Sequence, residues 1–544
     1  MTTSIPERIS SDTIPVDAWS PFRYTMFRWL WIATVVSNIG TWFQEVGVAW
    51  LMTSLTPSPL MVALVQTATT LPVMLFALPA GALSDILDRR RMLIFAVIWH
   101  TLAALLLAVS TLVGATTALV LLLFTFLFGI GTALTQPAWQ AIVPELVPRE
   151  HLPPAIAINS AGINVARAIG PAIAGVVIAS FGVVPAFFLN AVSFAGVLWL
   201  LYNWKRLPVR QNLPPEPIGQ AVWTGLRYVR FAPQLRNVLI RTALFIIFGS
   251  ALWALLPLIA RQQLGVGAGG YGMLLGAIGV GALIATALLP RVRPHTTTDT
   301  LVFGASIMYA VVMLVAAISG QFIFVFAMLL FGGMAWLTLL STFQTNAQLV
   351  VTGWIRGRAM ATYFIVFFGG MAGGSLLWGT VAEFVGISTA MLLATAGLVI
   401  GLLGRLRFPL GQTDQVDTTP STHQVSHTLD QVAESERTSA PVLVMIHYRI
   451  DPAQWGSFLQ AINELGVSRQ RSGAMRWEVY RSLDEPEQVV EQFVVSSWMA
   501  HMRQHERETM DDHQIHERVN AFHQEEEPPL VRHFIAPDKP DTYI

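Results

Sequence analysis

The sequence has no cysteine among its 544 residues, so disulfide bonds, thiol nucleophiles and cysteine-ligated metal or iron–sulfur centres are excluded. Charge is scarce as well, since Asp, Glu, Lys and Arg together make up only 12% of the chain. Ordinary soluble domains carry roughly twice that share. Hydrophobic residues make up 53%, and the mean hydropathy is +0.55. This composition indicates a polytopic membrane protein.

Charge-free stretches show where the chain is expected to cross the membrane, because a bilayer core takes about 20 apolar residues per helix. They cover residues 46–84, 92–144, 168–204, 242–260, 262–290, 300–355, 359–382 and 384–404. Divided at glycine, proline and charged positions, the apolar sequence predicts twelve membrane-spanning helices. Their expected limits are 27–51, 58–83, 92–112, 117–141, 154–180, 185–204, 237–261, 269–290, 299–319, 322–349, 357–383 and 387–407.

Lysine and arginine lie almost entirely on one side of these helices. The connections after even-numbered helices hold fourteen, namely Arg89, Arg90, Arg91, Arg149, Lys205, Arg206, Arg210, Arg227, Arg230, Arg236, Arg291, Arg293, Arg356 and Arg358. The connections after odd-numbered helices hold only Arg261. Cytoplasmic loops carry the excess of basic residues, so this asymmetry predicts an inner-membrane protein with both termini in the cytoplasm. Residues 1–26 are then cytoplasmic, and they lack the features of a cleaved secretory signal.

The membrane region contains an internal repeat. GPAIAGVVIASFG begins at Gly170 and GSLLWGTVAEFVG begins at Gly374, and the same offset aligns Gly175 with Gly379, Gly182 with Gly386, and Arg89 with Arg293. Together with the helix order, this predicts two parallel six-helix halves. The expected halves are 27–204 and 237–410, joined by a basic cytoplasmic linker over 205–236.

The last part of the chain is polar and contains no stretch that could span a membrane. Residues 411–440 are typical of a flexible linker, and 441–544 are expected to form a soluble cytoplasmic domain. Alternating and helical patterns predict strands at 441–450, 476–483, 488–495 and 529–537, a helix at 451–466 and one long helix at 496–522. This β-α-β-β-α-β order is that of an α+β ferredoxin-like fold.

The segment GALSDILDRRR begins at Gly81, after the second helix. It resembles the loop 2–3 signature of the major facilitator superfamily at Gly81, Leu83, Asp85, Arg89 and Arg90, and it departs from that signature at Ile86 and Asp88. With the TWFQEVGVAW stretch of the first helix and the polar tail, the chain more specifically resembles the transmembrane secretion effector branch, which includes siderophore exporters. The tail is similar to antibiotic-biosynthesis-monooxygenase-like domains, which usually pair through their sheets.

The resemblance implies a gating role for this loop. Asp85 ends the second helix, where a carboxylate could cap the start of the eleventh helix beside Arg356 and Arg358. Such a latch would hold the two halves together in the outward-facing state. The alternative is that these charges only fix the topology and contact anionic lipid headgroups.

Polar residues within the predicted helices are candidates for the substrate and proton pathway. Asn164 and Arg167 can share one face of helix five, and Asn38 and Glu45 one face of helix one. Arg167 suits an anionic or hydrogen-bonding substrate or pairs with a buried carboxylate. Glu45 is a candidate proton carrier or a residue of the outer mouth.

Helix five also carries Gly162, Gly170, Pro171 and Gly175, which resemble the glycine–proline signature of exporters, although a plain packing stripe would look similar. Helix four has no arginine, where proton-coupled drug exporters carry a basic residue. Trp42, Trp50, Trp253 and Trp336 could line an apolar cargo site or lie at the membrane interface.

In the tail, His501 and His505 stand four residues apart, a spacing that can bind zinc, but the surrounding charges favour a solvated helix face. We therefore expect no metal, no cofactor and no enzymatic site. The sequence predicts a transporter that exports small organic molecules by alternating access, with proton antiport as the drive. Its expected partners are a small-molecule substrate, protons, membrane lipids and a second copy bound through the tail, with no nucleic acid. An importer of the same fold and a membrane-tethered enzyme are the alternatives.

Overall fold

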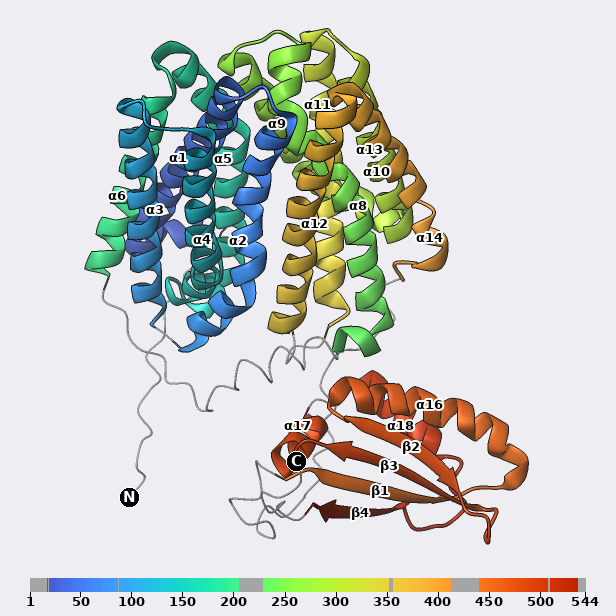
Figure 1. The fold of residues 1–544 in the computed structure, drawn as a ribbon. Coiled ribbons are helices and arrows are strands. Elements are labelled where there is room, and N and C mark those ends of the chain that lie inside the picture. Colours follow the sequence, from blue (N-terminus) through green and yellow to red (C-terminus); the bar gives the residue numbers. More distant parts are fainter. Residues whose placement is uncertain are drawn as a thin grey trace, which may run out of the picture.

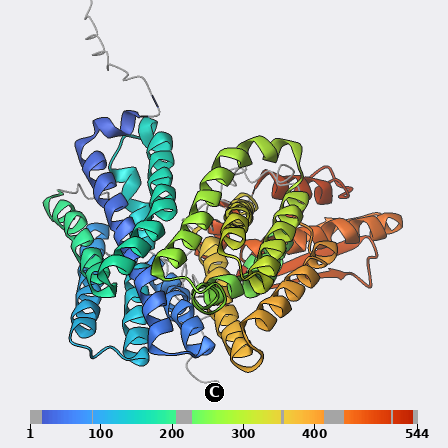
Figure 2. The same cartoon turned by 90° about the horizontal axis from the view of Figure 1, so that it is seen from above.

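The computed structural model describes residues 17, 19–86, 88–204, 228–351, 356–411, 440–506 and 509–536. Within these residues, twelve long helices form one bundle, and a four-stranded sheet with its own helices forms a second domain (Figure 1). The predicted fold class, a twelve-helix membrane domain followed by an α+β domain, is therefore confirmed. The two groups of helices lie side by side when the bundle is seen along its axis (Figure 2).

The first half contains α1 (Thr25–Leu55), α2 (Pro59–Ile86), α3 (Arg89–Leu112), α4 (Ala118–Ile142), α5 (Leu152–Phe181) and α6 (Val183–Asn203). The second half contains α8 (Pro233–Leu258), α9 (Ala268–Val292), α10 (Thr298–Ile318), α11 (Phe322–Leu349), α12 (Arg356–Val385) and α13 (Ile387–Gly401). Short turns η1 (Ser20–Arg23), η2 (Val143–Glu145), η3 (Arg149–His151), η4 (Ile259–Gln263), η5 (Arg293–His295) and α14 (Gly404–Arg407) flank them. The twelfth span covers Ile387–Arg407, as predicted, with a turn at Leu402 and Leu403 between α13 and α14.

Eleven of the described helices are long and apolar enough to cross a membrane. The exception is α1, whose middle carries Asn38, Gln44 and Glu45. It nevertheless belongs to the bundle, since Trp31 Nε1 donates to Ile158 O of α5 at 3.0 Å. Asn190 of α6 also donates to Gln44 Oε1 at 3.4 Å. Part of the low hydropathy of α1 therefore comes from Gln44, a polar residue that α6 covers.

The repeat predicted from the glycines is present in the backbone. Gly182 after α5 and Gly386 after α12 both have φ +83°, a conformation that residues with a Cβ rarely adopt. At Gly170, a Cβ would lie 2.6 Å from Trp42 of α1, the first helix of its half. At Gly374, it would lie 2.6 Å from Ile247 O of α8, the first helix of the other half. Equivalent glycines thus make equivalent contacts.

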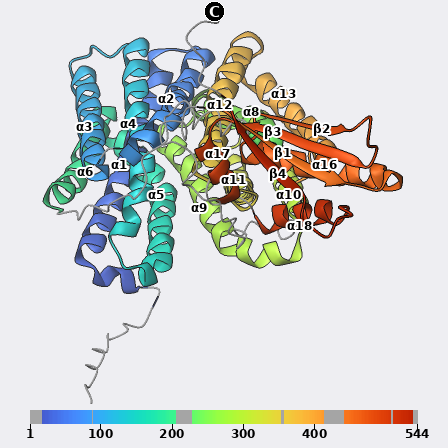
Figure 3. The same ribbon diagram turned by 90° about the horizontal axis from the view of Figure 1, so that it is seen from below.

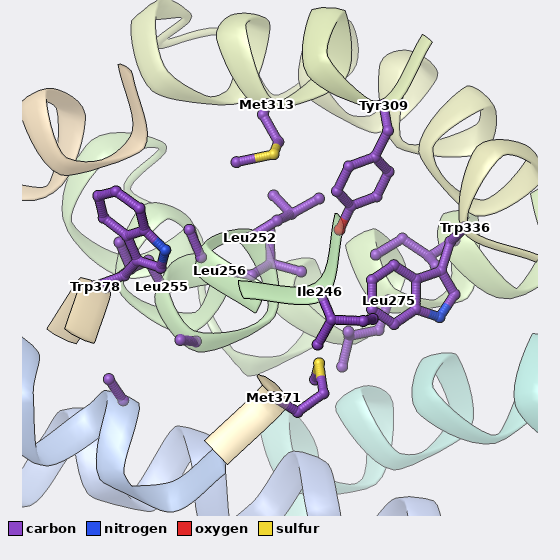
Figure 4. Close-up of a cluster of buried hydrophobic side chains, with 14 of the residues drawn as sticks. Ile246, Leu252, Leu255, Leu256, Leu275, Tyr309, Met313, Trp336, Met371 and Trp378 are labelled. Atoms are coloured by element: carbon purple, nitrogen blue, oxygen red, sulfur yellow. The ribbon is translucent and has the colours of Figure 1, made fainter. Parts of the chain in front are cut away.

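The second half is built around α8, which is buried along most of its length. Tyr309 of α10 donates to Gly249 O at 3.1 Å, and Trp378 of α12 donates to Ile247 O at 2.8 Å. Both rings therefore bury their polar atoms against carbonyls of α8. Figure 4 shows them around Leu252, Leu255 and Leu256, together with Trp336 and Met371.

The tail domain contains β1 (Val442–Arg449), η8 (Pro452–Gln454), α16 (Trp455–Ser472), β2 (Arg476–Arg481), β3 (Gln488–Val495), α17 (Trp498–Glu506), α18 (Met510–Asn520) and β4 (Leu530–Ile535). Its strand order is β2-β3-β1-β4 with every pair antiparallel, as a ferredoxin-like fold requires (Figure 3). Alternate residues of β1 and β3 pack on α16, with Tyr448, Phe458 and Phe493 at the centre of a separate core.

The prediction of one long helix over 496–522 was wrong. Thr509 has an extended backbone, and its hydroxyl accepts from Asp512 N at 3.1 Å. The Asp512 carboxylate accepts in return from Thr509 N at 3.3 Å, which completes a capping box. This cap begins a second helix, α18, at Met510.

The chain leaves the bundle at an anchored segment, Phe408–Leu410. Asn237 of α8 donates to Pro409 O at 3.0 Å, and Leu410 N donates to Asp299 Oδ2 at 2.9 Å. Arg241 of α8 pairs with Asp299 at 3.1 Å and lies 3.5 Å from Phe408 O. Leu410 is itself buried. The described chain beyond it ends at Gly411 and resumes at Ala440.

Candidate transport pathway

Glu45 and Arg167 form what we call the pathway pair. The Glu45 side chain is exposed to solvent although it lies well inside α1, between the buried residues Gln44 and Val46. Its carboxylate interacts electrostatically with the half-buried Arg167 guanidinium of α5. Among the described residues, no hydrogen bond or ion pair within 4.0 Å joins the two groups. Because a charge facing lipid is costly, we expect the pair to face the interior of the bundle.

Tyr271 extends this site into the second half. It lies near the start of α9, is buried, and interacts electrostatically with Glu45. Its ring stacks on Trp50 of α1 with centroids 6.2 Å apart. Glu45 of α1 therefore interacts electrostatically with one residue of its own half, on α5, and one of the other half, on α9. Sequence reasoning did not find Tyr271, because no periodicity or motif marks it.

The predicted polar neighbours lie on the expected helices without joining the pathway pair. Asn38 on α1 and Asn164 on α5 are both half-buried. The described hydrogen bonds connect neither of them to Glu45 or Arg167. Gln44 points instead toward Asn190 of α6. Placing the two asparagines in the pathway thus stays a prediction.

The four tryptophans proposed for a cargo site all pack within the bundle. Trp42 lies against Gly170, and Trp50 lies against Tyr271. Trp253 and Trp336 pack on each other with centroids 5.2 Å apart. None of the four is exposed.

The helix-five signature lies at two helix crossings. Gly162 packs against Trp31 of α1, and Gly170 packs against Trp42. A Cβ at these glycines would lie 2.8 Å and 2.6 Å, respectively, from the nearest ring atom. Pro171 and Gly175 face α9, and a Cβ at Gly175 would lie 2.9 Å from Gly272 Cα. A Cβ on Gly279 of α9 would lie 2.4 Å from Arg167 O. The small residues therefore let the two halves touch backbone to backbone beside the pathway pair.

The loop between α2 and α3 is tied to its own half through its arginines. Arg89 pairs with Glu145 at 3.1 Å. Arg90 donates to the carbonyls of Leu201 at 2.7 Å and Tyr202 at 2.6 Å, at the carboxyl end of α6, where a cation is favourable.

Asp88, where the superfamily signature has glycine, caps α3 by accepting from Arg91 N at 2.9 Å. Arg91 itself is exposed. A Cβ at Gly81 would meet no atom within 4 Å, so the structure gives no packing reason for glycine there.

The helices that carry the predicted latch run antiparallel and pack together. Thr67 of α2 donates to Ala372 O of α12 at 3.0 Å, and Met74, further along α2, lies against Gly369, which is earlier in α12. Residues later in α2 therefore contact residues earlier in α12. Arg356 there is exposed and Arg358 is half-buried, while the side chain of Asp85 lies outside the described side chains. The latch between Asp85 and this helix end stays a prediction.

Comparison with known proteins decides the family. Residues 16–541 match the transmembrane secretion effector family. The chain belongs to this family. The match spans the membrane bundle and the tail domain, and it confirms the resemblance carried by the GALSDILDRRR segment.

Relatives of this secretion effector protein carry names that describe transport. It is 25% identical over 371 residues to the staphyloferrin A transporter of Staphylococcus aureus, covering 66% of this chain and 91% of that one. It is 26% identical to an enterobactin exporter of Salmonella typhimurium, covering 72% and 94%. It is 25% identical to the multidrug efflux pump Tap of Mycolicibacterium fortuitum, covering 69% and 95%.

Solved structures agree in fold. A bacterial homologue of the lysosomal transporter Spinster, in an inward-facing conformation, superposes with a TM-score of 0.57 at 15% identity, covering 71% of this chain and 98% of that one. A bacterial homologue of the iron transporter ferroportin, also inward-facing, gives 0.56 at 16% identity, covering 71% and 98%. This member of the transmembrane secretion effector family is thus a multi-pass membrane transporter of the major facilitator fold.

Proposed function

We propose that this secretion effector protein exports small organic molecules across the inner membrane by alternating access, in exchange for protons. The observation that supports this most directly is the pathway pair, in which a carboxylate on α1 and a guanidinium on α5 interact electrostatically within the first half. The names of the relatives support cargo of siderophore-like or drug-like character.

Competition at Glu45 would give exchange rather than co-transport. Cargo that donates hydrogen bonds through hydroxyl, amide or ammonium groups binds the ionised carboxylate best. A proton on Glu45 removes that acceptor, so cargo and proton exclude each other. Arg167 would hold the acceptor groups of the same cargo, and Tyr271 would transmit the change to α9.

The distribution of basic residues bears on which end of the bundle is cytoplasmic. We infer that the bundle end carrying Arg89, Arg90 and Arg356 is cytoplasmic, with both chain termini on that side. Arg91, which is exposed, is then placed to contact lipid headgroups. Asp85 would cap the start of α12 when this end closes.

The tail would assemble the transporter rather than catalyse a reaction. One face of its sheet is covered by α16, α17 and α18, while the other carries exposed Leu530 and Phe534 on β4. On that face, Phe534 lies opposite Leu443 of β1. We infer that a second copy covers this apolar face, because an exposed sheet face of this kind needs a partner.

The function is tested in proteoliposomes with an imposed pH gradient, using enterobactin and ethidium as probes. Wild-type protein should move at least one probe against its gradient at the expense of the pH gradient. Glu45→Gln should bind probe without competition from protons and should lose the dependence on the pH gradient. Arg167→Ala should weaken probe binding more than Arg167→Lys, which keeps the charge but not the forked geometry.

Gln66→Leu in α2 serves as a control that removes a polar group outside the pathway pair. If Glu45→Gln keeps full coupling to the pH gradient, the proton site lies elsewhere. If wild-type protein moves both probes only inward, the proposed direction is wrong.

A further inference from the structure

The bundle end opposite the basic residues is almost free of charge. Its six connections and the helix turns that flank them contain only two charged residues, Arg261 and Glu383. Both belong to the second half, and both side chains reach the first half. We propose that Arg261 and Glu383 are positioning residues that hold this outer end closed and must release it in each transport cycle. The proposal rests on the proposed function for the meaning of the cycle.

Arg261 binds the end of α1. Its guanidinium donates to Thr53 Oγ1 at 3.0 Å and to Ser54 Oγ at 2.8 Å, and it lies over the Trp50 ring. These residues form the last two turns of α1, where the helix dipole favours a cation.

Arg261 is presented by a turn that its own half fixes. It lies in η4, a π-helical turn that follows α8. Gln263 of this turn donates to the carbonyls of Ala316, Ala317 and Ser319 at the end of α10. Such turns are frequent at functional positions. The turn is therefore held to the second half while its arginine extends to the first.

Glu383 binds the beginning of α2. Its Oε2 accepts from Ser58 Oγ at 2.7 Å and from Leu60 N at 3.1 Å. Ser58 precedes α2 and also accepts from Met61 N, so the carboxylate completes the cap of a helix N-terminus. An anion is favourable at this position for the same reason that a cation is favourable at the end of α1.

Residues 53–60 are thus held from two sides, and we call this arrangement the outer clamp. Glu383, from α12, places an anion at the N-terminus of α2, and Arg261, from η4, places a cation at the C-terminus of α1. Each charge is therefore opposite in sign to the helix-dipole charge that it meets. Both side chains are exposed, so solvent screens the contacts and they can break and reform. A gate needs such contacts, whereas a permanent joint would be buried.

The clamp also explains the single exception to the distribution of basic residues. Arg261 is the one arginine in the connections after odd-numbered helices. A basic residue in an outer connection runs against the distribution of Lys and Arg that sets the orientation in the membrane, so its presence indicates a function at that end of the bundle.

The test measures how far the outer ends of the two halves lie apart. Because the chain has no cysteine, Val113→Cys and Ile318→Cys can be spin-labelled without background. Both positions are exposed at the outer end, Val113 directly after α3 and Ile318 at the end of α10, and neither belongs to the clamp. Distance distributions are recorded on the full chain in lipid nanodiscs without cargo.

Arg261→Ala and Glu383→Ala should each increase the population with separated outer ends, and the double variant should increase it roughly threefold or more. Glu383→Gln keeps an acceptor without the charge and should lie between wild type and Glu383→Ala. The matched control is Thr117→Val, which removes a cap at the same end but within the first half alone. It should leave the distribution unchanged.

Distributions identical to wild type in all clamp variants, or an equal shift in Thr117→Val, would overturn the proposal. The outcome does not depend on coupling to protons. A shifted distribution together with unchanged coupling in Glu45→Gln would keep the clamp and reject the proposed drive. An unshifted distribution with the expected Glu45→Gln result would reject the clamp alone.

Discussion

At the scale of single residues, three histidines of the tail form a chain. His501 of α17 lies with its Nε2 3.0 Å from His533 Nε2 of β4 and 3.3 Å from His505 Nε2. The pKa of His501 is lowered to about 2. Burial is the largest cause, and the neighbouring His505, His533 and Arg469 add to it. His501 is therefore neutral at physiological pH in the folded domain.

This burial predicts how the stability of the tail depends on pH. In the unfolded chain His501 titrates near 6.5, so below that pH the unfolded state takes up a proton that the folded state refuses. Its contribution to stability is complete above pH 6.5 and is lost as the pH falls from there toward 2. We expect the thermal midpoint of the tail domain to fall between pH 7 and pH 5, with a smaller fall in His501→Phe.

The measurement is a series of melting curves for residues 440–544, with His516→Gln as a control that removes a histidine outside the chain of three. A fall of the same size in His501→Phe as in wild type would contradict the assignment to His501.

The sequence predicted only part of this cluster. The spacing of His501 and His505 was visible, because positions four apart share a helix face. His533 was not, because its place depends on the pairing of β4 with β1, which sets Val444 opposite His533. Tyr271 escaped for a similar reason, since its approach to Glu45 depends on how two helices from different halves cross. Glu45 and Arg167 could be proposed from the sequence because a charge within an apolar helix is itself a signal.

At the scale of elements, glycines decide how closely helices approach. The crossing of α5 and α9 joins the two halves, and a Cβ on Gly279 would lie 2.4 Å from Arg167 O and 2.5 Å from Ala168 Cα. Backbone atoms cannot move aside as a flexible side chain can. The repeat of glycines was readable from the sequence, but the partner helix of each glycine was not, because the spacing of small residues does not name the surface they meet.

Gly279→Ala should therefore separate α9 from α5 and destabilise the membrane domain by about 1–3 kcal/mol. Gly304→Ala in α10 is the matched control, since a Cβ there would meet no atom within 4 Å. Alanine is also the better helix former, so the control should be neutral or slightly stabilising. Thermal unfolding of the two purified variants makes the comparison. Equal midpoints would mean that the crossing adjusts without cost.

At the scale of the whole molecule, the chain leaves the membrane bundle at an anchored exit. Phe408–Leu410 is held by Asn237, Arg241 and Asp299, so the tail begins from the second half. The sequence placed the end of the bundle near residue 410 by the loss of apolar residues. It could not show that the last three residues belong to the packed structure, since their partners lie more than a hundred positions earlier.

Truncation tests this boundary. A chain ending at Gly411 keeps the anchor and should insert, fold and transport like the full protein, at an altered rate if the tail regulates it. A chain ending at Arg407 loses the buried Leu410 and its hydrogen bonds and should be less stable by about 2–4 kcal/mol. Size-exclusion profiles and melting curves of both chains make the measurement. Identical curves would show that the anchor contributes nothing.

The composition of α1 also bears on how the protein is made. Among the long helices that the structure describes, α1 is the one that does not qualify as a membrane span by its own hydropathy. Gln44 and Trp31 find their hydrogen-bond partners on α6 and α5, which are synthesised more than a hundred residues later. Until then their polar atoms have no cover in lipid, where unsatisfied groups are costly. We expect α1 to wait at the translocation channel and to enter the bilayer together with α5 and α6, so biogenesis of the first half is completed only when its last helix has been made.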